Sequence, residues 1–258
     1  MKGTFLLQSA LLGLQASLST QLSIPRAPQN ITAYPTTTIA NVTVVDTELV
    51  RQALTFARGH SNDIVWNHVM RGWLYGTLIY ANNATLRKTV DAEAHALAAI
   101  LHDLGWDQTP NSPVVSPDRR FEVDGAIAAR DFIRQHTHDS SAWDDNRLQL
   151  VWDSIALHSQ ESIYKYKQDT VMVTGTGISV DLEGVSTTGI SLPEYDAVGQ
   201  AFPRTELRQG VNETFIWLCA SKPSSTWGTF MQPFGDHYVA NYSAVGHRVF
   251  DIINDVKD

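Results

Sequence analysis

Residues 94–105, AHALAAILHDLG, constrain this chain most, because an apolar helical run ends there in the adjacent pair His102-Asp103. Ionisable side chains at the end of a buried helix are costly in free energy unless a partner compensates them. A metal ion is a partner that an imidazole and a carboxylate can share. We therefore predict a helix over 90–104, with Gly105 as its C-cap and a metal ion beside its end.

The composition limits the class of protein. A chain of 258 residues, 43% of them hydrophobic, is long enough for one domain with a sizeable core. The net charge of −8 argues against a nucleic-acid partner, since such sites need clustered lysines and arginines. Beyond residues 1–19 the sequence has no run of about 18 apolar residues, so no membrane span is expected once this N-terminal segment is removed. The expected partner is a small-molecule substrate.

Residues 1–19 have the features of a signal peptide: an early charge at Lys2, a short apolar stretch and small residues near Ser19. The alternative is a buried N-terminal helix. N-x-[ST] sequons favour secretion, and each of them is predicted to be exposed and glycosylated. Their asparagines are Asn30, Asn41, Asn83, Asn212 and Asn241. The protein is therefore expected outside the cell or in the lumen of a eukaryotic secretory pathway.

The chain contains a single cysteine, Cys219, so no internal disulfide can form and the hydrophobic core alone must hold the fold. This cysteine lies within the apolar run 215–220. We predict that it is a buried small hydrophobic side chain rather than a nucleophile.

Hydrophobic periodicity predicts an all-α fold, a single helical bundle over 46–258 that follows an extended arm over 20–45. The predicted helices cover 47–59, 61–81, 90–104, 121–135, 146–158, 193–202, 212–220 and 242–256. Residues 168–181 are β-prone and interrupted by glycines, so we expect a short β-prone or irregular segment there. This segment is predicted to be either a hairpin or a loop that leads into a helix at Asp181.

The candidate metal ligands are His68, His102, Asp103 and Asp181. Two imidazoles and two carboxylates suit Zn²⁺ or Fe²⁺, and also Mn²⁺ or Ni²⁺, so the ligand types alone do not choose the metal. Asp181 has a second interpretation as a helix N-cap. Three other aspartates compete with it for the role of fourth ligand: Asp153, Asp169 and Asp196.

The predicted catalytic residues are Asp103 and His158. His158 ends the helix over 146–158, where it either interacts with the helix dipole, moves a proton or binds a second metal ion. His136 and His138 lie in a polar segment and are expected to be exposed.

Three further residues are candidates for the pocket or for hydrogen bonds to the ligands. His95 lies two turns before His102 on the same helix face, so it can line a cavity or orient a ligand. Glu122 and Asp124 lie at the start of the helix over 121–135. There they either interact favourably with the helix dipole or supply a general acid.

The order of His68, the motif LHDLG at 101–105 and the distant Asp181 resembles the HD-domain metal-dependent superfamily. Within it, the pattern is most similar to fungal cyanamide-hydratase-like HD-domain proteins, the secreted ones in particular. The segments that carry the resemblance are NH at 67–68, LHDLG at 101–105, RFEVDGA at 120–126, ALH at 156–158 and DLEG at 181–184. The resemblance as a whole covers roughly residues 47–250.

This resemblance implies a single HD-domain over 46–258 with a divalent metal, Zn or Fe, held by the four candidate ligands. It also implies a hydrolase or hydratase that acts on a small organic molecule through metal-activated water. The sequence FEVDGA at 121–126 replaces an aromatic-rich stretch of the cyanamide-hydrating enzymes, which argues against cyanamide as the substrate.

Three alternatives stay open. His136 and His158 echo the ligand order of dinuclear members, which would make the protein an HD-type diiron oxygenase. The same Lewis acid would also serve a lyase or isomerase, such as a tailoring enzyme of a secondary-metabolite pathway. The third alternative is a secreted binding protein that has lost its metal.

Overall fold

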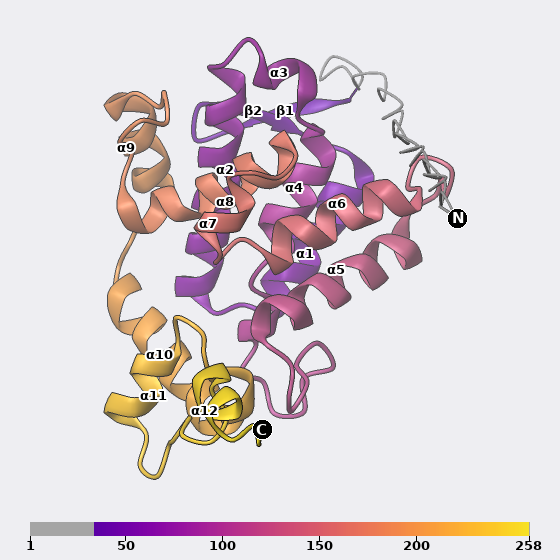
Figure 1. Ribbon diagram of the computed structural model, residues 1–258. Coiled ribbons are helices and arrows are strands. Elements are labelled where there is room, and N and C mark those ends of the chain that lie inside the picture. Colours follow the sequence, from indigo (N-terminus) through magenta and orange to yellow (C-terminus); the bar gives the residue numbers. More distant parts are fainter. Residues whose placement is uncertain (1–33, 258) are drawn as a thin grey trace, which may run out of the picture.

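Helix α4 (Ala92–Leu101) is the centre of the fold, and all ten of its residues are buried in the computed structural model, which describes residues 34–257 (Figure 1). Its five alanines let other helices approach closely. Helices α1, α2, α5, α6 and α8 surround it and form the main hydrophobic core. The all-α prediction is confirmed.

The other elements follow in chain order. They are β1 (Thr36–Ile39), β2 (Val42–Val45), α1 (Glu48–Gly59), α2 (Asp63–Ala81), α3 (Leu86–Thr89), the 3-10 helix η2 (Leu104–Trp106), α5 (Phe121–His136), α6 (Asp145–Ala156), α7 (Glu161–Tyr164), α8 (Asp169–Glu183), α9 (Leu192–Ala201), α10 (Leu207–Ser221), the 3-10 helix η3 (Pro223–Ser225), α11 (Gln232–Tyr238) and α12 (Val249–Asn254).

The starts of the first two helices lie where capping residues predict them. The side chain of Thr47 accepts a hydrogen bond from the backbone N–H of Val50 at α1, and Asn62 does the same for Val65 at α2. The predicted end of α4 is wrong, because the helix stops at Leu101 and not at Leu104. A Cβ atom on Gly105 would lie 2.2 Å from the carbonyl oxygen of Phe121, so this glycine permits the contact with α5 instead of capping α4.

The prediction of a β-prone or irregular segment near 168–181 is also wrong, because these residues form the regular helix α8. One of its glycines, Gly177, serves a close contact with α2. A Cβ atom on Gly177 would lie 2.5 Å from the backbone nitrogen of Gly76, so only glycine fits there. Burial against α2 therefore outweighs the low helix propensity of the glycines and β-branched residues.

The prediction of an extended arm over 20–45 is wrong for its described part, residues 34–45. β1 and β2 form an antiparallel hairpin whose register pairs Thr36 with Val45. Ala40 and Asn41 both have positive φ, which suits a two-residue hairpin turn. The buried side chains of β2 pack against α2 and α4. The predicted signal peptide at 1–19 and the sequon at Asn30 lie outside the described residues.

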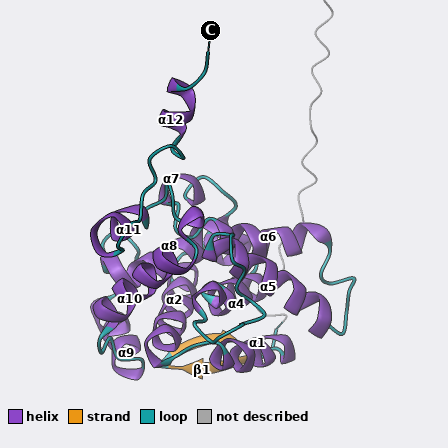
Figure 2. Ribbon diagram, turned by 90° about the horizontal axis from the view of Figure 1, so that it is seen from below, coloured by secondary structure: helices purple, strands orange, loops and turns teal. Residues whose placement is uncertain are grey.

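The C-terminal helices α10 and α11 form a separate layer at one end of the bundle (Figure 1). They enclose a second apolar cluster, which consists of Val65, Val69, Trp106, Phe121, Phe215, Leu218, Cys219 and Met231. Cys219 is fully buried, as predicted, and its thiol donates to the carbonyl oxygen of Met231. Helix α12 is shorter than the predicted 242–256 and stands away from the body (Figure 2).

The exposure predicted for the sequons holds for Asn41, Asn83 and Asn241. Asn212 is half-buried inside α10, and the hydroxyl of Thr214 in the same sequon donates to a backbone carbonyl of that helix. Within residues 34–257, no helix combines the length and the hydrophobicity that crossing a bilayer requires.

Candidate metal centre

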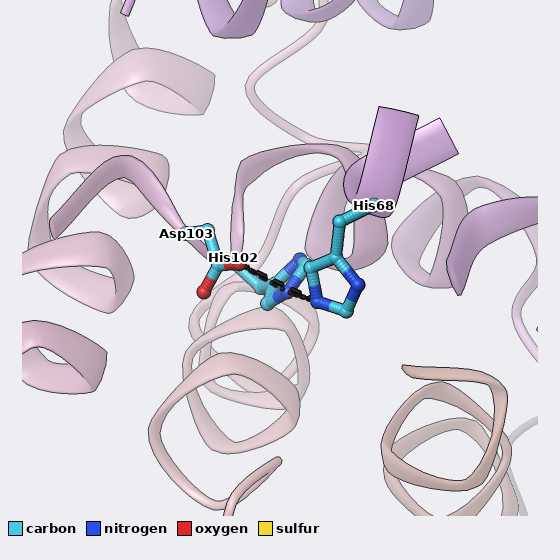
Figure 3. A group of neighbouring side chains, drawn as sticks. All are labelled: His68, His102 and Asp103. Atoms are coloured by element: carbon cyan, nitrogen blue, oxygen red, sulfur yellow. Dashed lines mark hydrogen bonds and ion pairs between the residues drawn. The ribbon is translucent and has the colours of Figure 1, made fainter. Parts of the chain in front are cut away.

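Two segments of the chain bring His68, His102 and Asp103 together in the interior (Figure 3). His68 lies in the second turn of α2, and the other two residues directly follow α4. The Nε2 atoms of the two histidines are 3.4 Å apart. Asp103 Oδ2 lies 3.0 Å from His102 Nε2 and 3.5 Å from His68 Nε2. The three side chains are no more than 3% exposed.

The hydrogen bonds of the two imidazoles fix where their protons lie. His68 Nδ1 contacts Asp181 Oδ2 at 2.7 Å, and His102 Nδ1 contacts the carbonyl oxygen of Ala99 at 2.8 Å. Both partners only accept hydrogen bonds, so each Nδ1 carries a proton and donates it. In the neutral rings, each Nε2 atom is then left with a lone pair. The short distance between the two Nε2 atoms is therefore no hydrogen bond.

Asp103 completes a set of electron-pair donors that face one another. Neither of its carboxylate oxygens has a hydrogen-bond partner among the described residues, although both are buried. Burial raises the pKa of Asp103, but pairing with a protonated His102 outweighs this and holds it below its usual range, and the same pairing raises the pKa of His102. A buried carboxylate without a donor is costly in free energy. A cation between the three donors removes that cost, so the group formed by His68, His102 and Asp103 can bind a metal ion.

Asp181, predicted as the fourth ligand, is not part of this group of ligand atoms. Its carboxylate accepts the proton of His68 Nδ1 and pairs with Arg71 through contacts of 2.6 and 2.8 Å. Arg204 lies 2.9 Å from Oδ1. Burial raises the pKa of Asp181, but His68 and Arg71 lower it by more than burial raises it, so this pKa lies well below its usual range. The expected role is therefore corrected: Asp181 orients His68 from behind, as carboxylates often do for metal-binding histidines.

His158 lies beside the group of His68, His102 and Asp103 without being part of it. Its ring centroid is 4.8 Å from that of His102. Its Nδ1 donates to the carbonyl oxygen of Ile155 at 2.7 Å, which leaves Nε2 with a lone pair. Burial and the nearby His102 lower the pKa of His158 to about 4. At neutral pH this residue is an uncharged base.

Glu122 supports His158 rather than facing the metal group. It accepts a hydrogen bond from the hydroxyl of Ser159 at 2.5 Å and pairs with Arg120. Ser159 directly follows His158, so the buried Glu122 fixes the turn that presents this histidine.

Asp124 and His136 lie in other parts of the fold. Asp124 accepts from Lys222 Nζ at 2.8 Å and joins α5 to the C-terminal layer. His136 is half-buried instead of exposed, donates to the carbonyl oxygen of Phe132 and lines a pocket between α1 and α5. The exposure predicted for His138 holds.

Sequence reasoning missed Arg71 and Arg204. Arg71 carried one signal, a single charge within the apolar stripe of α2, three residues after His68. Arg204 carried none, because its position depends on contacts between distant segments.

His95 is fully buried two turns before His102, but its hydrogen bonds turn it away from the metal group. Nδ1 lies 2.9 Å from the hydroxyl of Thr174, and Nε2 lies 3.2 Å from the carbonyl oxygen of Trp73. The ring thus connects α4, α8 and α2. Burial lowers the pKa of His95 from 6.5 to about 4.

This shift predicts acid lability. Above pH 6.5 His95 is neutral in both states, and its contribution to stability is complete. As the pH falls, the unfolded chain takes up a proton that the folded protein excludes until about pH 4. Stability from this residue alone should fall by roughly 2 kcal/mol between pH 7.5 and pH 5. Urea denaturation of the wild type and of His95→Gln at both pH values checks this, because the variant should lose that part of the pH dependence. Equal pH dependence of the two proteins would contradict it.

No protein-family model matches this chain, and no curated protein gives a significant match.

Proposed function

We propose that this protein is a secreted, metal-dependent enzyme of the HD-domain type that hydrolyses or hydrates a small organic molecule. The observation that supports a metal most strongly is the convergence of three buried groups that can each offer a lone pair to one ion. His68, His102 and Asp103 provide two imidazoles and one carboxylate. Catalytic Zn²⁺ sites with His₂Glu ligands and non-haem Fe²⁺ sites use the same combination of donors and keep positions open for substrate or water.

A single ion is favoured over a pair. A diiron centre needs further ligands close by, and the sequence offered His136 and His158 for that role. His136 lines a different pocket, and its Nδ1 is engaged by its own helix. His158 is close enough to serve the reaction, but its one free ring nitrogen suits proton transfer to and from a substrate.

The metal, when bound, would polarise a substrate carbonyl, nitrile or phosphoryl group and lower the pKa of water. The chain's own residues would do the rest. Asp181 fixes the orientation and tautomer of His68, so that Nε2 faces inward. His158 accepts a proton at Nε2 and returns it to the leaving group. Glu122 holds the turn that carries His158. The rings of Trp106 and Phe121 limit the access of bulk water.

Elemental analysis of protein purified from the medium of a eukaryotic host tests the proposal, and the same preparation reports secretion and glycan mass. We expect one equivalent of zinc or iron for each chain. Protein that holds no metal, even after incubation with Zn²⁺ or Fe²⁺, would overturn the proposal.

Isotope labelling separates the possible reactions. Turnover of a panel of esters, nitriles and phosphodiesters in ¹⁸O-water should place the label in the product. Label that comes from O₂ would favour an oxygenase, and a product that contains neither label would favour a lyase or isomerase.

A further inference from the structure

The ligand atoms of the metal centre are enclosed, so a substrate must pass a covering side chain to reach them. Trp106 is such a side chain. Its ring stacks on His68, with centroids 5.9 Å apart and planes inclined by 12°. The same tryptophan lines a surface pocket of about 240 Å³. Val65, one turn before His68 on α2, lines this pocket too. The pocket is thus separated from the metal centre by a wall one side chain thick.

This pocket, called the Trp106 pocket below, contains an oriented histidine. His60 Nδ1 lies 2.7 Å from Asp107 Oδ2. Asp107 also accepts hydrogen bonds from the hydroxyl of Ser112 at 2.7 Å and from the backbone of Thr109. Burial raises the pKa of Asp107, but these hydrogen bonds lower it below its usual range, so the carboxylate is ionised. His60 therefore donates through Nδ1, and its neutral form keeps a lone pair on Nε2.

The lining selects the chemistry of a ligand. Among the described residues, none that lines the Trp106 pocket is a lysine or an arginine, whereas Asp107 contributes a negative charge. An anion would find no lysine or arginine side chain to pair with here. A neutral or cationic molecule with an N–H or O–H group would donate to His60 Nε2. The volume equals that of about eight liquid waters, which suits a molecule of similar heavy-atom count.

Trp106 is not anchored by its polar atom. Its buried Nε1 has no hydrogen-bond partner within residues 34–257. A buried N–H without an acceptor is unfavourable. Turning the ring away from His68 therefore breaks no hydrogen bond and allows Nε1 to donate to an acceptor.

We propose that the Trp106 pocket binds a small neutral or cationic hydrogen-bond donor, with His60 as its acceptor, and that Trp106 is the gate from this pocket to the metal centre. That the gate leads to a metal centre rests on the function proposed above. Binding in the pocket does not, because none of its residues is a metal ligand.

Binding is tested on the full, metal-free chain with two probes of the same shape, acetamide and acetate. The ¹⁵N resonance of His60 Nε2 should shift saturably with acetamide and not with acetate. His60→Gln and Asp107→Asn should abolish the saturable effect on the neighbouring backbone amides. His136→Gln, at the histidine of the other pocket, should leave it unchanged. Ser112→Ala is a further control, because it removes one hydrogen bond to Asp107 and keeps His60. Equal shifts with both probes, or no saturable shift in folded wild-type protein, would overturn the binding site.

The gate is tested by the rate at which zinc-loaded protein releases its metal to a chromogenic chelator. Trp106→Ala should release zinc about tenfold faster than the wild type. Trp227→Ala is the matched control, since Trp227 also has a buried, unpartnered Nε1 but lies in the C-terminal layer, where it stacks on His247. Equal release from wild type and Trp106→Ala would overturn the gate. Protein that binds acetamide but no zinc would instead overturn the proposed function and leave the pocket standing.

Discussion

Replacing His102 with glutamine should leave the purified protein without stoichiometric metal. His102 Nε2 is one of three inward-facing ligand atoms, and an amide is a poor substitute for an imidazole. The loss of metal affinity should exceed the roughly 10–100-fold that is typical when a residue supporting a ligand is removed. The variant should also lose the stabilisation that metal gives the wild type, about 4 kcal/mol at a metal concentration of 1,000 times Kd. Elemental analysis and urea denaturation with and without Zn²⁺ measure both effects.

The same helix supplies the control for this experiment. His95 is as deeply buried as His102, two turns earlier in α4, and makes its hydrogen bonds away from the metal group. His95→Gln should alter stability but keep the full metal content. Full occupancy in His102→Gln would show that the metal lies elsewhere.

The second large effect is expected from Asp181→Asn. This change removes the charge that neutralises Arg71 and weakens the hydrogen bond that orients His68. Leaving a buried charge without its partner costs about 3–5 kcal/mol of stability. Metal affinity should fall by roughly 10–100-fold, because Asp181 supports a ligand and is not one itself. Denaturant titration measures the loss of stability, and competition for zinc with a chelator of known affinity measures the loss of metal affinity.

This result separates two roles for Asp181. A direct ligand would give the complete metal loss expected for His102→Gln, whereas an orienting residue gives a partial one. Asp251→Asn controls for the loss of a carboxylate that pairs with an arginine. Asp251 pairs with Arg248 on α12, where water screens the charges, so its removal should change stability little.

Local rules predicted the helices whose signals lie within their own sequence. α1 and α2 combine an apolar stripe with a capping residue, and the bounds of α1, α2 and α5 agree closely with the predicted ranges. α8 could not be predicted in this way. Its glycines and β-branched residues disfavour an isolated helix, and the contact that stabilises it comes from α2, about a hundred residues earlier. The hairpin was missed for the same reason, since the valines of β2 are buried by helices that follow it.

The candidate site was also predictable only in part. His68, His102 and Asp103 were found because two of them are adjacent and the third lies on an apolar stripe, and the structure brings them together. The role of Asp181 was not predictable. A carboxylate becomes a ligand or an orienting group according to the cations around it, and Arg71 and Arg204 reach it only in the folded chain.

The burial of Cys219 has a practical consequence. Burial raises the pKa of this thiol, and its side chain is inaccessible in the apolar cluster that adjoins Trp106. A thiol reagent can therefore react only after the C-terminal layer has opened. With one cysteine in the chain, the labelling rate measures the free energy of that opening at a single, native position, with no engineered probe.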